Sequence, residues 1–520
     1  MSTEQTRQKQ GLIQLLRANG QEQRAQRGAP RFRIDAAMWE ELGGRLGKGL
    51  DLMGLWADAQ DVHMALFAPD EKDFAIVSLA VEDGAFPSIG ARHPAAIRLE
   101  RAIQDLYGHG ARGLPDGRPW LDHGAWPIRH PLNEKADAAQ SGEEKDETQD
   151  YAFLPVEGEG VHEIPVGPVH AGIIEPGHFR FSCAGETVVR LEERLGYTHK
   201  GVERLMQGKP PAEAARIAAR TCGDSTVAYS FAFARACEAA LEVEVPPRAA
   251  WLRALMAELE RLANHLGDTG AICNDAAFAF LHAHFGVLRE DVLRAADTCF
   301  GHRLMMDCIV PGGVARDLDA EKGAHVLQLL LDSLDERLEK LVEIYDTTAS
   351  LQDRVRNTGR LSPALAQGFA AGGYVGRASG RAFDARLSLP YPPYDSLAVK
   401  MHVMHKGDVN ARVWVRIHEI RESIGLVRTI MHNMPQGDLT AELPGNTAQV
   451  REGVAVVEGF RGDVLAWLRL DEEGLVARCH LRDPSWFQWP LLEAVIYGNI
   501  VADFPLCNKS FNCSYSGHDL

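Results

Sequence analysis

The sequence lacks the cysteine spacing on which paired-thiolate metal sites depend. Its 520 residues include nine cysteines, and no two of them stand in a CxxC pair. Four-thiolate zinc and iron–sulfur sites are commonly built from such pairs, so a site of that construction has no support. Scattered cysteines in a long chain without secretory features predict reduced thiols in a cytosolic setting.

Several catalytic motifs are missing as well. The chain has no Walker motif, no GxGxxG that follows a predicted strand, and no HExxH. Each of these motifs would hold phosphate groups or a zinc ion. Nucleotide chemistry therefore has no support.

Long apolar runs are also lacking. A membrane-spanning helix needs roughly 18 consecutive apolar residues. The best stretch, residues 486–501, is interrupted by Gln488, Pro490, Glu493 and Asn499. Residues 1–20 resemble neither a signal peptide nor an anchor. We therefore expect any membrane role to depend on partner subunits.

Positive charge is scarce relative to negative charge. Lys and Arg number 55, Asp and Glu number 72, and the formal net charge is −17. An acidic surface of this size argues against nucleic acid as the main partner. Hydrophobic residues make up 45% of the chain, which is ordinary for a globular protein with a sizeable core.

A charged, polar stretch divides the chain. Residues 133–150 read NEKADAAQSGEEKDETQD, with almost no large apolar side chain. Such a run cannot bury enough surface to offset its ordering entropy. The sequence therefore predicts an N-terminal domain at 1–132, an acidic linker at 133–155 and a C-terminal domain at 156–520.

Apolar periodicity predicts an α+β fold. In the N-terminal part, 73–81 is typical of a strand and 95–107 of a helix that stops at Gly108, which indicates a small α/β domain. The C-terminal part opens with β-like residues around 166–189 and continues as a mainly helical domain with β elements at both ends. Its clearest predicted elements are helices at 249–266, 320–345 and 410–434 and a β-hairpin across 464–481.

Specific phrases identify a family. Residues 92–123 (RHPAAIRLERAIQDLYGHGARGLPDGRPWLDH) resemble the C subunit of bacterial NADH–quinone oxidoreductase. Beyond the linker, phrases in family order resemble the D subunit, among them EPGHFRF at 175–181, GETVVRLEERLGYTHKGVERLM at 185–206, EGFRGD at 458–463 and RDPS at 482–485. The D-subunit fold is shared with nickel–iron hydrogenase large subunits. A fusion of both parts resembles the formate hydrogenlyase and hydrogenase-4 large subunits of group 4.

The resemblance implies a candidate metal site. Hydrogenases of this family hold nickel and iron with two CxxC pairs, a ligand set that suits soft, electron-rich metals. Here the early motif aligns at Cys222 and Ser225, next to Arg220, and the late motif at Cys513 and Ser516. Both bridging positions are serine, a hard oxygen donor of high pKa. Cys222 and Cys513 are therefore either remnant terminal nickel ligands or small buried packing residues.

The resemblance also implies a quinone site, which is incomplete. Of the complex I pattern GPxHPxxHG, His170 is retained, whereas Pro176 takes the place of the second histidine. His170 and His178 are candidates to line a remaining cavity, or are hydrogen-bonded core histidines. Arg482 is carried over as a residue of the loop that approaches the cavity in the family.

Two charged sets have a functional and a structural interpretation. The phrase at 193–203 would contact an iron–sulfur partner, or is a solvated helix face. Arg412, Arg416 and Glu419 recur on one predicted helix. When buried, they would form a charge relay toward a membrane arm, and when exposed, an ordinary ion-pair row.

These expectations define three functions to compare, with quinone reduction as a fourth. The first is an electron-transfer or coupling subunit of a membrane-associated complex I-like assembly, with its nickel–iron site lost or remodelled. The second is an active group 4 hydrogenase with unusual ligands, and the third is a non-redox scaffold subunit. The resemblance implies an iron–sulfur small subunit, a ferredoxin-like subunit and antiporter-like membrane subunits as partners, with the iron–sulfur clusters in those partners. It places the chain at the inner face of the cytoplasmic membrane.

Overall fold

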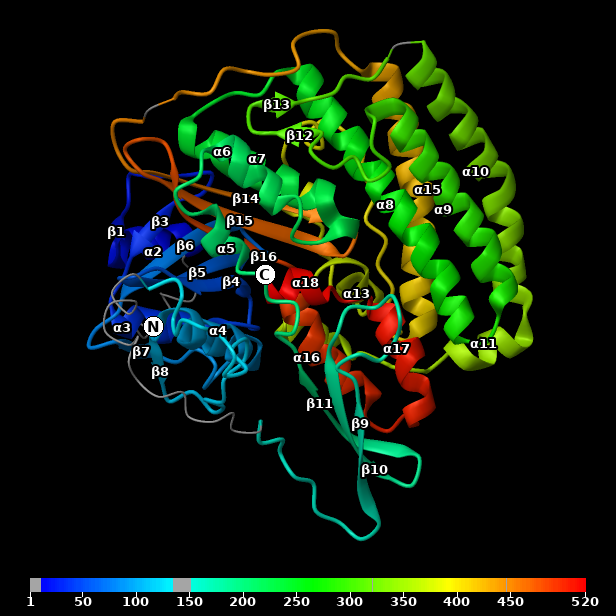
Figure 1. The fold of residues 1–520 in the computed structure, drawn as a ribbon, viewed down its shortest axis with the longest axis horizontal. Helices are drawn as coiled ribbons and strands as arrows, with labels where there is room; N and C mark the ends of the chain where they lie inside the picture. The colour runs from blue at the N-terminus through cyan, green and yellow to red at the C-terminus, as the bar shows by residue number, and fades with distance from the viewer. Residues whose placement is uncertain (1–10, 134–150, 320, 446) are drawn as a thin grey trace, which may run out of the picture.

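The computed structural model describes residues 11–133, 151–319, 321–445 and 447–520. Most of the predicted acidic linker lies outside these residues. The fold is α+β, as predicted, with a sheet near the N-terminus, a helical middle and strands near the C-terminus (Figure 1).

The N-terminal part is built on a five-stranded mixed sheet of order β1-β3-β6-β5-β4. Only β3 and β6 pair in parallel, and the other pairs are antiparallel. Its strands are β1 (Gln21–Glu22), β3 (Arg31–Arg33), β4 (Asp51–Ala57), β5 (Asp61–Ala68) and β6 (Asp73–Ala80). Its helices are α2 (Leu12–Asn19), α3 (Ala36–Arg45) and α4 (Ile97–Tyr107), and a small sheet joins β7 (Ala85–Pro87) to β8 (Gly110–Arg112). The predicted strand and helix are confirmed as β6 and α4, and Gly108 caps α4 in the left-handed region.

The C-terminal part begins with an antiparallel sheet that extends away from the body (Figure 1). It consists of β9 (Val161–Val166), β10 (His178–Ala184) and β11 (Thr187–Arg194). The short helices α5 (Val202–Met206), α6 (Pro211–Ala218) and η2 (Gly223–Ser225) lead into α7 (Thr226–Leu241).

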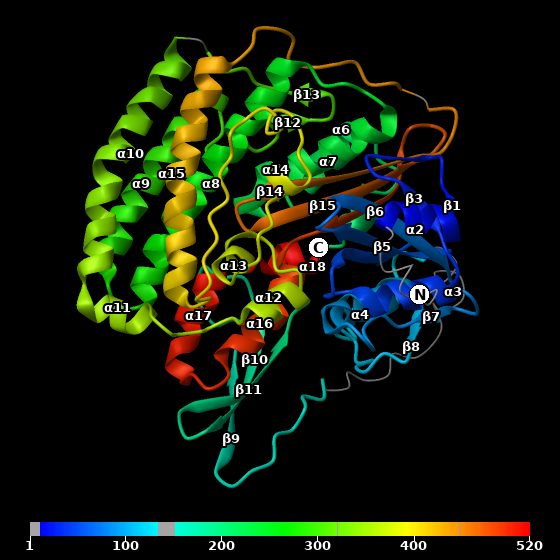
Figure 2. The ribbon, with the colours of Figure 1, turned by 180° about the vertical axis from the view of Figure 1, so that it is seen from behind.

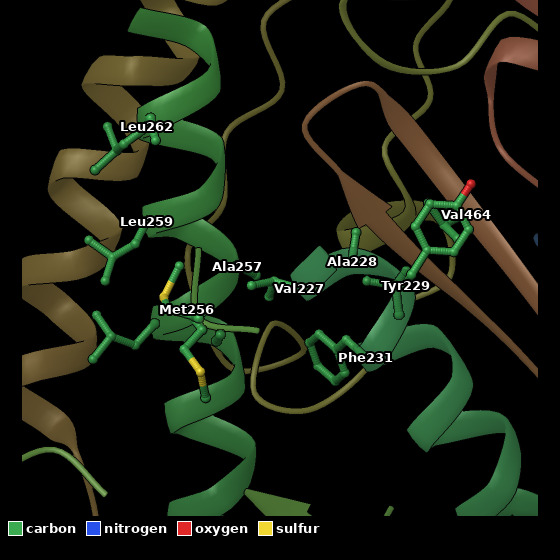
Figure 3. Packing of buried hydrophobic residues seen from close by; sticks show 14 of the residues in the cluster. Val227, Ala228, Tyr229, Phe231, Met256, Ala257, Leu259, Leu262 and Val464 are labelled. Atoms are coloured by element: carbon green, nitrogen blue, oxygen red, sulfur yellow. The ribbon is translucent and has the colours of Figure 1, made fainter. Parts of the chain in front are cut away.

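A bundle of long helices forms the helical middle (Figures 1 and 2). It contains α8 (Pro247–Asp275), α9 (Ala279–Phe300), α10 (Lys322–Thr347) and α15 (Val409–Asn433), which confirms the three predicted helices and extends the first of them to Asp275. Between them lie β12 (Ile309–Val310), β13 (Gly313–Val314), α11 (Ala349–Val355), α12 (Pro363–Gly368), α13 (Gly373–Ala378) and α14 (Ala385–Ser388). Figure 3 shows Leu259 and Leu262 of α8 on one side of that helix, while Val227 and Phe231 of α7 lie on the other side. Since α8 carries apolar side chains around most of its circumference, it is stable only where other elements cover it on several sides.

The last sheet joins the two ends of the chain. Its order is β16-β15-β14-β2, in which β2 (Gln26–Arg27) from the N-terminal part pairs in parallel with β14 (Arg451–Gly459). The predicted hairpin is confirmed as β15 (Gly462–Leu470) and β16 (Val476–Arg482). The chain then forms α16 (Ser485–Ile496), η3 (Val501–Asp503), α17 (Phe504–Phe511) and α18 (Tyr515–Asp519). The last of these helices reaches the centre of the molecule (Figure 1).

Candidate functional site

The two cysteine motifs meet in space. Cys222 lies at the start of η2, and Cys513 lies between α17 and α18. The Cys222 Sγ is 3.1 Å from the Oγ of Ser514, although these residues are 292 positions apart in the chain. The early and late motifs therefore form one site, which we call the cysteine site and define by Cys222, Asp224, Ser225, Arg461, Cys513 and Ser514.

The guanidinium of Arg461 occupies the centre of the cysteine site. Arg461 lies in the tight turn between β14 and β15, and its two terminal nitrogens each donate to an oxygen of Asp224 at 2.6 Å. One of them also donates to Ser225 Oγ at 3.0 Å and to Cys222 Sγ at 3.7 Å. Its Nε donates to the carbonyl of Asn512 at 2.5 Å. One buried arginine thus connects both motifs by charge-assisted hydrogen bonds.

Both thiols are held in the protonated form. Burial, followed by the negative charge of Asp224, raises the pKa of Cys222 to about 12, and its Sγ donates to Asp224 Oδ1 at 2.8 Å. Burial raises the pKa of Cys513 well above its usual range, and its Sγ lies 3.9 Å from Gln488 Oε1. Burial therefore favours the neutral thiol at both positions.

The residues present do not fit a four-thiolate nickel–iron centre. Ser225 Oγ is already engaged by Arg461 at 3.0 Å and by Asp224 at 3.3 Å. Ser516 is buried at the start of α18, where its backbone N–H donates to Glu175 Oε2 at 3.0 Å. The site presents two thiols, two hydroxyls and the Arg461–Asp224 ion pair, a harder set of groups than four thiolates. Across the part of the chain that the structure describes, no three His, Cys, Asp or Glu side chains gather as a metal site.

The RDPS phrase positions the late motif. The hydroxyl of Tyr229 on α7 donates to Asp483 Oδ2 at 2.7 Å, and Asp483 Oδ1 accepts the backbone N–H of Ser485 at 2.8 Å. The Ser485 Oγ in turn accepts the backbone N–H of Ser514 at 2.8 Å. Burial and Asp483 raise the pKa of Tyr229 well above its usual range, so its hydroxyl stays a donor.

The predicted arginines lie apart from the thiols. Arg482 is fully buried and donates from Nε to the carbonyl of Met53 on β4 at 2.7 Å, and it also pairs with Asp463. It therefore joins the hairpin to the N-terminal sheet. Arg220 is 47% exposed and forms a bidentate ion pair with Asp307, with both distances 2.7 Å.

The two candidate histidines differ in position. His170 Nε2 lies 3.2 Å from the hydroxyl of Tyr515, which places it beside the late motif. His178 lies on β10, with Nδ1 3.4 Å from the carbonyl of Gly167 and Nε2 accepting from Arg180. Burial lowers the pKa of both imidazoles. The structure brings His170, but not His178, into contact with a residue of the late motif.

Of the charged residues at 193–203, Glu193, Arg194 and Glu203 are buried, whereas Lys200 is exposed. Glu193 pairs with Arg98 at 3.1 Å, and Glu203 pairs with Arg478 at 2.8 Å. Arg412, Arg416 and Glu419 on α15 are buried as well, so they do not form a surface ion-pair row.

Sequence reasoning missed Arg461 and Asp224. Arg461 stands within the EGFRGD phrase, and Asp224 stands inside the early motif, so both were in view. No local pattern pairs them, since their bond joins positions 237 residues apart.

A cavity lies away from the cysteine site. It has a volume of about 360 Å³ and lies between the N- and C-terminal parts, with Ile103, Trp126 and Leu205 among its lining residues. None of the residues of the cysteine site lines it.

Comparison with known proteins places the chain among redox enzymes. The family described as "Respiratory-chain NADH dehydrogenase, 49 Kd subunit" matches residues 277–455, and the family described as "Nickel-dependent hydrogenase" matches residues 200–267. Formate hydrogenlyase subunit 5 of Escherichia coli is 31% identical over 84% of this chain and 77% of its own length. The chain belongs to this family of complex I and nickel–iron hydrogenase subunits.

Other relatives agree with that placement. Hydrogenase-4 component G of Escherichia coli is 31% identical over 86% of this chain and 79% of its own length. The NADH-quinone oxidoreductase C/D subunit of Bacteroides thetaiotaomicron is 27% identical over 80% of this chain and 82% of its own length. A chain of the membrane-bound sulfane sulfur reductase, an archaeal respiratory membrane complex, superposes with a TM-score of 0.66 and 24% identity over 71% of this chain and 100% of that chain, which shows the shared fold.

The resemblance seen in the sequence is thus confirmed at the level of the family, which includes membrane-bound hydrogenases. In the described ranges of this family member, no helix is long and apolar enough to cross a membrane.

Proposed function

We propose that this chain is an electron-transfer or coupling subunit of a membrane-associated, complex I-like or hydrogenase-4-like oxidoreductase complex, and that it has lost the nickel–iron centre. The observation that carries the proposal is the Arg461–Asp224 ion pair between the two cysteine motifs. It places a guanidinium, paired with a carboxylate, where the two motifs meet.

The chemistry of the cysteine site supports a remodelled centre. A four-thiolate nickel–iron centre would need a thiolate at each of four positions, whereas two of the aligned positions are serine. The guanidinium keeps its proton at every physiological pH, so it offers a constant electrostatic potential to a neighbouring redox group.

An exposed apolar loop supports docking of an iron–sulfur partner. Ile173 is 100% exposed and Val169 is 81% exposed, both between β9 and β10 and close in sequence to His170. Apolar side chains that gather in solvent on one loop favour a protein contact. We propose that this loop is covered by an iron–sulfur small subunit, and that a ferredoxin-like subunit and antiporter-like membrane subunits complete the complex at the inner face of the cytoplasmic membrane.

The division into domains is part of the proposal. We propose a domain like the complex I C subunit at 1–132 and a domain like the D subunit at 156–520. The five-stranded sheet lies in the first range, and the four-stranded sheet lies in the second except for β2, which pairs across the boundary with β14.

Metal analysis with infrared spectroscopy tests the proposal. We expect the natively purified complex to contain no stoichiometric nickel on this chain and no bands of iron-bound carbon monoxide or cyanide. A nickel-dependent hydrogenase purified in the same way serves as the positive control. One nickel per chain together with these bands would establish an active hydrogenase with unusual ligands instead.

A further inference from the structure

The cavity between the N- and C-terminal parts has a mainly apolar lining. The N-terminal part contributes α4 and the chain after β8, with Leu99, Ile103 and Trp126. The C-terminal part contributes α5, β16 and the start of α16, and Leu205 lies on α5. Its volume of about 360 Å³ is in the range of sites that hold small organic molecules.

Three side chains in this lining carry a buried polar atom that has no hydrogen-bond partner among the residues that the structure describes. The atoms are the hydroxyl of Tyr107 on α4, Nε2 of His480 on β16 and Nε1 of Trp486 on α16. These residues are 2%, 6% and 3% exposed. Because a buried polar group without a partner destabilises the folded state, native proteins pair nearly all such groups. Three of them around one apolar cavity point to a ligand that supplies the partners.

The free nitrogen of His480 is a hydrogen-bond acceptor. His480 Nδ1 lies 2.8 Å from Glu203 Oε1. Although burial raises the pKa of Glu203, Arg478 and His480 outweigh that effect and lower the value, and burial lowers the pKa of the imidazole. The neutral ring therefore donates from Nδ1 to the carboxylate and keeps a lone pair on Nε2.

Tyr107 and Trp486 supply hydrogen-bond donors. The indole Nε1 can only donate. The guanidinium carbon of Arg478 lies 5.5 Å from the centre of the Tyr107 ring, but a guanidinium has no acceptor atom, so the phenol hydrogen still lacks one. The cavity thus offers two donors and one acceptor.

The buried charges of the lining have partners within the protein. Arg478 and Glu203 form an ion pair at 2.8 Å, and Asp519 accepts from the hydroxyl of Thr198 at 2.7 Å. A charged ligand would lose its hydration in an apolar cavity whose charges are already paired, which is costly. The same ion pair places Tyr107 and His480 near each other, since Arg478 lies beside the first and Glu203 bonds to the second.

The rim of the cavity is apolar too. Ile128 is 43% exposed and Leu205 is 53% exposed, and both belong to the lining. Residues 1–10 and 134–150, outside the described ranges, contain no Leu, Ile, Val, Phe, Trp or Tyr, so they have no large aliphatic or aromatic side chain to fill it other than Met1. The apolar rim and lining favour a separate apolar molecule as the occupant.

We propose that this cavity binds an uncharged small molecule with an apolar body and a hydroxyl group, which donates to His480 Nε2 and accepts from the Tyr107 hydroxyl, with Trp486 as a second donor. Since the lining comes from both parts of the chain, a bound molecule contacts both and stabilises the folded state by mass action. The site does not depend on the metal content of the cysteine site, so the two proposals fail independently.

Calorimetric titration of the purified full chain with two matched probes tests the site. The probe 4-butylphenol has an apolar body and a hydroxyl, and butylbenzene has the same body without it. We expect 4-butylphenol to bind once per chain, roughly five- to tenfold more tightly than butylbenzene, because one hydrogen bond contributes about that factor. The unfolding temperature should rise with its concentration.

Tyr107→Phe tests the polar end of the site. The variant keeps the ring beside Arg478 and stacked on His109 and removes the hydroxyl that lacks an acceptor. We expect the affinity for 4-butylphenol to fall roughly fivefold, while the affinity for butylbenzene and the unfolding temperature of the free protein do not fall. Tyr197→Phe changes a tyrosine that is 38% exposed and outside the lining, so this control should leave both affinities intact.

The proposal is overturned if the two probes bind wild type equally, or if Tyr107→Phe weakens both probes to the same extent. Leu106→Trp enlarges a half-buried side chain of the lining and should abolish binding of both probes. Unchanged binding in a Leu106→Trp protein that unfolds cooperatively would place the probes elsewhere and contradict the site. Binding by the purified chain but not by the natively purified complex would assign the cavity to a side chain of a partner subunit instead.

Discussion

Arg461 determines the hydrogen bonding at the centre of the cysteine site. It is buried, its charge is balanced by Asp224, and it donates to groups of both cysteine motifs. The thiols beside it stay protonated because burial disfavours the thiolate. At this scale the site is an ion pair surrounded by neutral thiols and hydroxyls.

Replacing Arg461 with methionine should strongly destabilise the protein. The change leaves Asp224, whose side chain is 34% exposed, without its counter-charge, so the loss should lie below the roughly 3–5 kcal/mol of a fully buried pair and above that of an exposed pair. Chemical denaturation would measure the loss. Arg220→Met is the matched control, since it removes an exposed ion pair with Asp307 that contributes roughly 0–1 kcal/mol. Equal losses in the two variants would show that Arg461 has no special role in the site.

Among the elements, α8 and α15 carry the interior of the molecule. Their periodicity predicted both helices, because apolar side chains recur on the buried faces. The same helices also present Glu258, His265 and Glu419 to one another, and this arrangement was beyond sequence reasoning. A buried acid on a helix has the same local pattern as an exposed one until its neighbours are known.

Truncation of the α8 core provides a test at the element scale. Leu259 is fully buried and points into the packed interior (Figure 3), so Leu259→Ala should lower the free energy of unfolding by about 2–5 kcal/mol. Leu329→Ala on α10 is the control, because that side chain is 57% exposed and its loss should cost less than about 0.5 kcal/mol. Thermal or chemical unfolding of both variants would measure these losses of unfolding free energy. Similar losses in the two variants would contradict the packing described for Leu259.

Over the whole molecule, the N- and C-terminal parts are joined by backbone and by charge. The pairing of β2 with β14 covers one edge of the C-terminal sheet, and Arg482 donates to the carbonyl of Met53 in the N-terminal sheet. The two parts therefore share a sheet and hydrogen bonds between buried groups. Because a buried group can bind its proton differently in the folded and the unfolded chain, the free energy of unfolding depends on pH.

The stability of the whole chain should depend on pH through Glu458. Its pKa is raised from 4.5 to about 7 in the folded protein, so the folded state binds this proton more tightly than the unfolded state. The resulting stabilisation is complete below pH 4.5 and is lost as the pH rises to about 7, with a total of the order of 3 kcal/mol.

Unfolding of wild type and Glu458→Gln at a series of pH values would measure this effect. The difference in unfolding free energy between the two proteins should fall across the interval from pH 4.5 to about 7. A difference that is constant with pH would show that Glu458 does not change its protonation on folding.

The sequence alone determined the family, the α+β class and the main elements, because these depend on local periodicity, turn residues and long characteristic phrases. It also predicted, from the resemblance, that Ser225 and Ser516 stand at the bridging positions. Only the tertiary structure decided that Arg461 and Asp224 pair between the motifs and that Arg220 lies at the surface. The physical reason is that pairing and desolvation act between residues far apart in sequence, so the charge of a buried group is fixed by neighbours that no local pattern reveals.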